Sequence, residues 1–131
     1  MLTDWERQAT WMLDADRVGV VSPHREGVGV RLAVRTRLFG VPAFTEPMEV
    51  TTWDPPHRLE MRHGRMVGGT GVWALTEDPA GARFRWSEDV RLRVPFIGEI
   101  AAIAYRPLMR ALMARAQRAL RDHVIAIGPV R

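Results

Sequence analysis

The segment GARFRWSEDVRLR, residues 81–93, alternates with the period of a β-strand and places one carboxylate, Glu88, in its apolar row. The other side chains of that row are Phe84, Trp86, Val90 and Leu92. An isolated buried carboxylate is unstable unless it accepts a hydrogen bond, takes up a proton or contacts water. Glu88 is therefore a candidate for a polar ligand anchor, or for a general acid or base.

Strand pairing brings a second ionisable residue, His63, towards Glu88. When the predicted strands are paired through their short turns, His63 lies opposite Gly69 and Glu88 lies opposite Gly71. Because the glycines have no side chains, we expect both ionisable groups to project into one hollow with room for a ligand or ordered water. Three interpretations are open. The two residues could be a polar anchor for a ligand, or an acid/base pair for enolisation and dehydration of a polyketone. Alternatively, the glycines merely let the sheet curve, and Glu88 pairs with an interior arginine or lies at a solvent-filled opening.

The elements that position these residues are predicted by the spacing of apolar side chains. A helical turn is expected over residues 4–13, and the period then becomes that of strands joined by short turns. From about residue 98 to 127 the apolar positions follow the helical period, which predicts one long amphipathic C-terminal helix. The expected strands are 16–22, 28–40, 43–53, 58–63, 68–78 and 81–93.

These elements predict an α+β fold in which a curved antiparallel sheet wraps around the C-terminal helix. The sheet has one apolar face, which must close on another apolar surface, and the helix supplies one. The interior row then lines a cup. Glu46 shares the inward phase of its strand but lies beside Pro47, so we expect it near the rim.

The composition excludes several classes of chemistry. The chain has no cysteine, and its four histidines lack metal-binding spacing, so we expect no metal and no disulfide. Only Ser22 and Ser87 offer a serine hydroxyl, without a nucleophile-elbow pattern, and the glycine-rich VGGTG leads into a strand, where it cannot cradle a nucleotide phosphate in the usual way. The net charge of +4 comes from scattered arginines rather than a basic block interleaved with aromatics, so we expect neither cofactor nor nucleic acid.

The sequence has no feature of a secreted or membrane-inserted protein. Its first residues include acids and lack the apolar core of a signal peptide, and no apolar run approaches the roughly 20 residues that span a bilayer. We therefore expect a single cytoplasmic domain over residues 1–131, without stable membrane insertion.

An ordered set of motifs resembles a known superfamily. The motifs are TDWERQATWM, GVG at 27–29, WDPPHRLEMRHG, GTGVWALTED, GARFRWSED and RPLMRALMARAQRALRDHV. Together they resemble the SRPBCC superfamily of START-like, helix-grip proteins, most closely its polyketide cyclase/dehydrase and lipid-transport group. The resemblance covers nearly the whole chain. It implies a seven-stranded antiparallel sheet that grips a C-terminal helix around an apolar ligand cavity; members include lipid carriers, aromatase/cyclases and many bacterial proteins of unknown ligand.

The chain departs from this pattern at its beginning. The family usually opens with a strand and a short helix ahead of the DW…W segment, and the first strand pairs with the one that corresponds to residues 82–94. Without it that strand is an unpaired edge. We expect either a misplaced start codon or an edge covered by a homodimer or by a bound strand, which would make the protein an interaction module.

The function that we predict is binding or carriage of a small hydrophobic or aromatic ligand, lipid or polyketide-like, in the internal cavity. The enzymatic alternative is a polyketide aromatase/cyclase or dehydratase that uses Glu88 and His63 as acid and base. Tryptophan and methionine at inward positions are more often ordinary core, but in a cup closed by one helix they would line the cavity in either case. The predicted ligand-binding residues are Trp11, Met12, Leu32, Val34, Met48, Val50, Met61, His63, Gly69, Gly71, Trp73, Phe84, Trp86, Glu88, Ala104 and Leu108.

Overall fold

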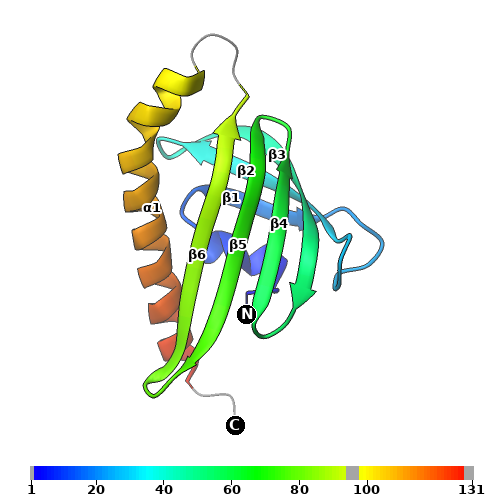
Figure 1. Cartoon of the computed structure of the whole chain (residues 1–131), viewed down its shortest axis with the longest axis vertical. Helices are drawn as coiled ribbons and strands as arrows, with labels where there is room; N and C mark the ends of the chain where they lie inside the picture. Colours follow the sequence, from blue (N-terminus) through cyan, green and yellow to red (C-terminus); the bar gives the residue numbers. More distant parts are fainter. Residues whose placement is uncertain (1, 94–97, 129–131) are drawn as a thin grey trace.

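The computed structural model describes residues 2–93 and 98–128, which form one antiparallel sheet and a long C-terminal helix (Figure 1). The six strands follow one another across the sheet in chain order, β1-β2-β3-β4-β5-β6. Their bounds are β1 Ala15–Val20, β2 Arg31–Leu38, β3 Val41–Asp54, β4 Arg58–Gly64, β5 Val67–Asp78 and β6 Gly81–Leu92. The predicted α+β architecture is confirmed, with six strands in the described residues where the resemblance implied seven.

The register of the last three strands agrees with the predicted pairing. β4 and β5 place His63 opposite Gly69, and β5 and β6 place Gly71 opposite Glu88. Short turns connect these strands, and a slip of one residue would turn every side chain to the opposite face of the sheet. Turn length and alternation together therefore specify which residues face the interior.

The first half of the sheet bends and the second half stays regular. One irregularity interrupts each of the pairings β1 with β2, β2 with β3, and β3 with β4. An extra residue in one strand of a pair bends that strand and increases its twist. β5 and β6 pair without interruption over 12 residues each. The sheet consequently curls, and its concave side receives the N-terminal segment (Figure 1).

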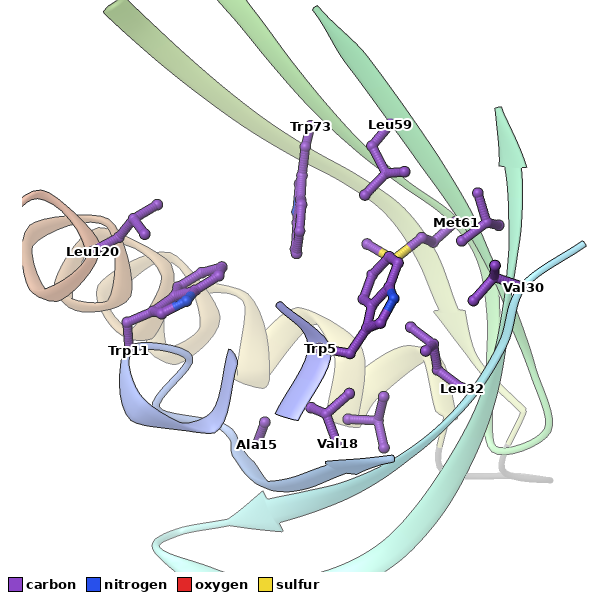
Figure 2. Packing of buried hydrophobic residues seen from close by; sticks show 12 residues of the cluster. Trp5, Trp11, Ala15, Val18, Val30, Leu32, Leu59, Met61, Trp73 and Leu120 are labelled. Carbon is purple, nitrogen blue, oxygen red and sulfur yellow. The ribbon is translucent and has the colours of Figure 1, made fainter. Parts of the chain in front are cut away.

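Residues before the first strand fill part of this concave side. The 3-10 helix η1 (Trp5–Thr10) is a shorter form of the helical turn predicted over 4–13. Trp5 and Trp11 are each 1% exposed, and Trp5 Nε1 donates a hydrogen bond to the carbonyl oxygen of Arg25 at 2.9 Å. Figure 2 shows both indoles among side chains of the sheet and of the C-terminal helix. The buried hydrophobic cluster consists of Trp5, Trp11, Ala15, Val18, Val30, Leu32, Val34, Val50, Leu59, Met61, Trp73 and Leu120.

Helix α1 (Gly98–Ile127) has the bounds predicted from the helical period and lies along β6 (Figure 1). Its C-terminal half supplies the buried residues Ala116 and Leu120. Ile100, expected on the same buried stripe, is 75% exposed, because the N-terminal end of α1 extends past the end of β6 and has no sheet to cover it there. None of the described helices combines the length and apolar character that crossing a bilayer requires.

An aromatic contact joins the N-terminal half of α1 to the sheet. The ring of Phe39, in the turn between β2 and β3, packs edge-on against Tyr105 of α1 with centroids 6.3 Å apart. Phe39 has a φ of 51°, which is unusual for a residue with a bulky side chain. Contacts of α1 with the rest of the domain therefore include Leu120 in the core and Tyr105 at this turn.

Candidate functional site

Glu88 and His63, which were predicted to project into one hollow from the two strands that flank β5, contact each other inside the curved sheet. His63 Nε2 lies 3.2 Å from Glu88 Oε2, and the two side chains are only 15% and 16% exposed. Trp86 Nε1 donates a hydrogen bond of 2.6 Å to Glu88 Oε1. Both carboxylate oxygens therefore have a partner, which is what a half-buried negative charge requires.

The positions that a Cβ atom would take at the two glycines are occupied by the protein itself, whereas room for a ligand or water was expected there. A Cβ atom at Gly71 would lie 2.7 Å from Glu88 Oε1 and 2.9 Å from Oε2. Gly69 has a φ of 133°, and a Cβ there would overlap the backbone of Asp89. Gly71 thus accommodates the carboxylate of Glu88, and Gly69 permits a backbone conformation and a close approach that other residues do not tolerate.

A third ionisable residue, Asp14, belongs to the same region, since the charges of Glu88 and His63 both act on it. It lies between η1 and β1. Burial is the largest effect on the pKa of Asp14 and raises it. A hydrogen bond from its own backbone lowers this pKa, the negative charge of Glu88 raises it, and His63 lowers it. Burial and then the charge of Asp14 raise the pKa of Tyr105. We call Asp14, His63, Glu88 and Tyr105 the polar cluster.

The polar cluster was only partly visible in the sequence. Glu88 and His63 were found because alternation placed them in apolar rows. Asp14 was missed because it lies in an irregular segment, where no period indicates which way a side chain points; its only signal is an acid among the apolar residues of WMLDA.

The chemistry available to the polar cluster is proton transfer. His63 Nδ1 is buried without a hydrogen-bond partner among the described residues, while Nε2 faces Glu88. A histidine held by a carboxylate at one nitrogen can exchange a proton at the other. Within the part of the chain that the structure describes, no group of three or more His, Cys, Asp or Glu side chains is arranged to hold a metal ion.

An aromatic layer lies next to the polar cluster. Trp73 packs against Trp11, Trp86 and Phe84, with ring centroids 5.6, 6.0 and 6.2 Å away. Trp86 also donates to Glu88, so this layer touches the polar cluster on one side. Nε1 of both Trp11 and Trp73 is buried and has no partner among the described residues, although each can donate one hydrogen bond.

A cavity of about 1000 Å³ lies on the other side of the aromatic layer, between the sheet and the C-terminal half of α1. Trp73 borders it, as do the turns at the ends of β3 and β5. Its apolar lining includes Leu2, Trp53, Pro55, Pro56, Leu59, Trp73, Leu75, Phe84, Leu120, Val124 and Ile125. The charged side chains among its described lining residues are Arg58, Arg118 and Arg121.

Two of the predicted ligand-binding residues, Trp73 and Phe84, line this cavity. Trp11, Leu32, Val34, Val50 and Met61 are core residues, and Met12, Met48 and Trp86 pack against that core. His63, Gly69, Gly71 and Glu88 lie on the polar-cluster side of the aromatic layer. Leu108 is half-buried and Ala104 is exposed. The described lining of the cavity includes none of these other predicted residues.

Some of the other lining residues could be anticipated from the sequence and some could not. Leu59 and Leu75 occupy inward-facing positions in the alternating pattern of their strands, so the sequence indicated that they face the interior. Gln117, Arg118 and Arg121 were missed because they lie outside the apolar stripe of α1, with Arg118 and Arg121 on the side opposite to it, and the contacts of such residues depend on how the helix is rotated against the sheet.

Glu46 has a structural role that its position in the sequence did not indicate. It was expected near the rim, but it is 2% exposed. Its carboxylate oxygens accept hydrogen bonds from the backbone N–H groups of Gly64, Arg65, Met66 and Val67, at 2.6 to 3.3 Å. The carboxylate is buried because the turn between β4 and β5 wraps around it and satisfies its charge.

The architecture is that of the helix-grip class, in which a curved antiparallel sheet holds a long C-terminal helix. Residues 1–123 match the family described as polyketide cyclase/dehydrase and lipid transport, and the chain belongs to that family. It is similar in structure to TTHA0849 from Thermus thermophilus, with a TM-score of 0.77, 19% sequence identity, and coverage of 98% of this chain and 87% of that one. This likeness concerns the fold. No curated protein matches the sequence.

Proposed function

We propose that the protein binds and carries a small hydrophobic or aromatic molecule in the cavity between α1 and the sheet. The observation that carries this proposal is the cavity itself, about 1000 Å³ and lined mainly by aromatic and aliphatic side chains. Pockets for small molecules typically have about 300–1,000 Å³ and an apolar lining with few polar groups. Lipid transport in the description of the family agrees with such a cargo.

The position of the ionisable groups favours carriage over catalysis. Among the described lining residues there is no carboxylate and no histidine, while His63 and Glu88 lie beyond the aromatic layer and bond to each other. A general acid or base must come within hydrogen-bond reach of the proton that it transfers. A molecule held in the cavity is therefore shielded from these groups by Trp73 and Trp86.

A matched pair of substitutions tests the carrier function. Ala114 and Ala111 are both exposed on α1, but only Ala114 is among the described lining residues. Thermal unfolding with a panel of fatty acids, flavonoids and aromatic polyketides should show a rise in Tm for at least one compound, because a ligand that binds only the folded state stabilises it. Ala114→Phe should reduce that rise and Ala111→Phe should leave it unchanged. If no compound changes Tm, or if both variants respond alike, the cavity is not the binding site.

A second candidate function is polyketide aromatisation or dehydration by the polar cluster, and the contact between His63 and Glu88 near the half-buried Asp14 favours it. In this alternative the aromatic layer opens so that a polyketone reaches His63. Glu88→Gln and His63→Ala should then each abolish turnover of a poly-β-ketone substrate without changing carriage in the cavity. Turnover that survives both substitutions would remove these two residues from any catalytic role.

A further inference from the structure

The charges at the cavity have one sign. Its charged lining residues, Arg58, Arg118 and Arg121, are all basic, and among the described lining residues none is acidic. Arg58 is already bonded to Glu60. No ion pair joins Arg118 or Arg121 to an acidic side chain within residues 2–93 and 98–128. Two guanidinium groups at the cavity are therefore available to an anion.

Two acids lie near these arginines, and neither forms a described ion pair with them. Asp78, in the last position of β5 near the cavity, is bonded to Arg83 at 2.9 Å. Asp122 is one residue after Arg121 and projects about 100° away from it around the helix axis. It is four residues after Arg118 and so lies next to that arginine, but no described ion pair joins the two side chains. Arg118 and Arg121 are three residues apart, which places them next to each other on one side of α1.

From this arrangement we propose that the cargo is an amphipathic anion, whose apolar body lies against Trp73 and Phe84 and whose carboxylate or phosphate group is bound by Arg118 and Arg121. This inference rests on the proposed carrier function and narrows it to a class of ligand. The guanidinium group matches both anions because its N–H donors form a planar fork that can bind two oxygens at once. In this proposal the apolar lining binds the apolar part of the ligand, and the two arginines select a ligand with an anionic head group.

The test compares three probes of equal chain length: dodecanoate, dodecyl phosphate and dodecan-1-ol, each kept below the concentration at which it aggregates. Binding is followed through tryptophan fluorescence, since Trp53 and Trp73 line the cavity. We expect at least one of the two anions to bind about tenfold more tightly than the alcohol, because hydrogen bonds to charged groups are stronger than those to neutral ones. The anion that shows the preference identifies the head group.

The double variant Arg118→Gln with Arg121→Gln should reduce the affinity for the preferred anion to that for the alcohol, and should leave the alcohol unchanged. Arg106→Gln with Arg110→Gln is the matched control, because these arginines are exposed on the same helix, outside the described lining, and the net charge changes equally. This control should keep the preference.

Two results would overturn the inference and leave the carrier function intact. The first is an alcohol that binds as tightly as both anions, and the second is a preference that survives in the Arg118 and Arg121 double variant. If none of the three probes binds at the cavity, then both the inference and the carriage of a single-chain cargo fail. Circular dichroism of each variant establishes that α1 is retained.

Discussion

Trp86 and Glu88 lie two residues apart on the same face of β6, and the indole N–H of the first donates to the carboxylate of the second at 2.6 Å. The strand therefore supplies both the half-buried charge and one of the donors that it needs. His63 contacts the other oxygen of the same carboxylate. Glu88, an acid in an apolar row, is thus stabilised by Trp86 on its own strand and by His63 on β4.

Removal of this indole donor should cost stability. In Trp86→Phe the carboxylate of Glu88 keeps His63 but loses a charge-assisted hydrogen bond, for which we expect about 1–3 kcal/mol of destabilisation. Urea denaturation of Trp86→Phe, Glu88→Gln and the double variant gives the coupling free energy between the two side chains, separately from lost packing. A coupling indistinguishable from zero would show that the hydrogen bond makes no net contribution to stability.

Gly71→Ala should displace the carboxylate of Glu88, since the new methyl group would lie 2.7 Å from one of its oxygens. We expect a loss of about 1–2 kcal/mol from steric repulsion and disrupted hydrogen bonds. Gly19→Ala on β1 is the control, because no atom lies within 4 Å of its Cβ position, and it should change stability by less than about 0.5 kcal/mol. In a Glu88→Ala background the Gly71 substitution should become nearly neutral; a full cost there would contradict this account.

Glu46→Gln should be among the more destabilising single changes in the sheet. The glutamine amide keeps one oxygen as a hydrogen-bond acceptor, but its NH₂ group faces the backbone N–H groups of residues 64–67. These groups are donors and cannot accept a hydrogen bond from the NH₂ group. We expect about 2–4 kcal/mol from the loss of charge and the unpaired buried donors. Glu49→Gln, at an exposed pair with Arg62, should cost less than about 1 kcal/mol. Equal midpoints in urea for the two variants would contradict the structural role of Glu46.

Asp14→Asn should stabilise the protein at neutral pH. Burial, with the charge of Glu88 in addition, raises the pKa of Asp14 above its ordinary value of 3.8, so the folded protein holds this proton more tightly than the unfolded chain does. The stability that comes from this tighter proton binding is fully present below pH 3.8, and it is lost as the pH rises through the raised pKa of Asp14 in the folded protein. The gain in Tm from the substitution should therefore shrink as the pH falls towards 3.8.

The control for this pH dependence is Asp89→Asn, an exposed aspartate on β6. It should produce a small change in Tm that does not follow the profile of Asp14→Asn. If Asp14→Asn instead lowers Tm at neutral pH, then the charged form of Asp14 is stabilised in the folded state and the direction assigned to its pKa is wrong.

The strands, the register of β4, β5 and β6, and the inward direction of His63 and Glu88 were predictable from the sequence because each depends on a period of two and on short turns. The direct contact between His63 and Glu88 was not predicted. The irregular segment that holds Asp14 has no such period. Glu46 was misplaced at the rim because its burial depends on backbone donors some 20 residues further along the chain, in a turn. The cavity depends on where α1 packs against the sheet. An apolar stripe indicates that a helix packs against another surface, but it does not indicate which turns of the helix make the contact.

Each strand from β2 to β6 pairs with the strand that precedes it in the chain. The sheet can therefore grow hairpin by hairpin, and each step closes only a short loop, at a small entropic cost. Helix α1 is different, since Leu120 must return to residues such as Trp11 at the far end of the sequence. We expect the docking of this helix to be the step of highest contact order in folding, so that a binding-competent interior exists only once α1 has packed against the segment around Trp11.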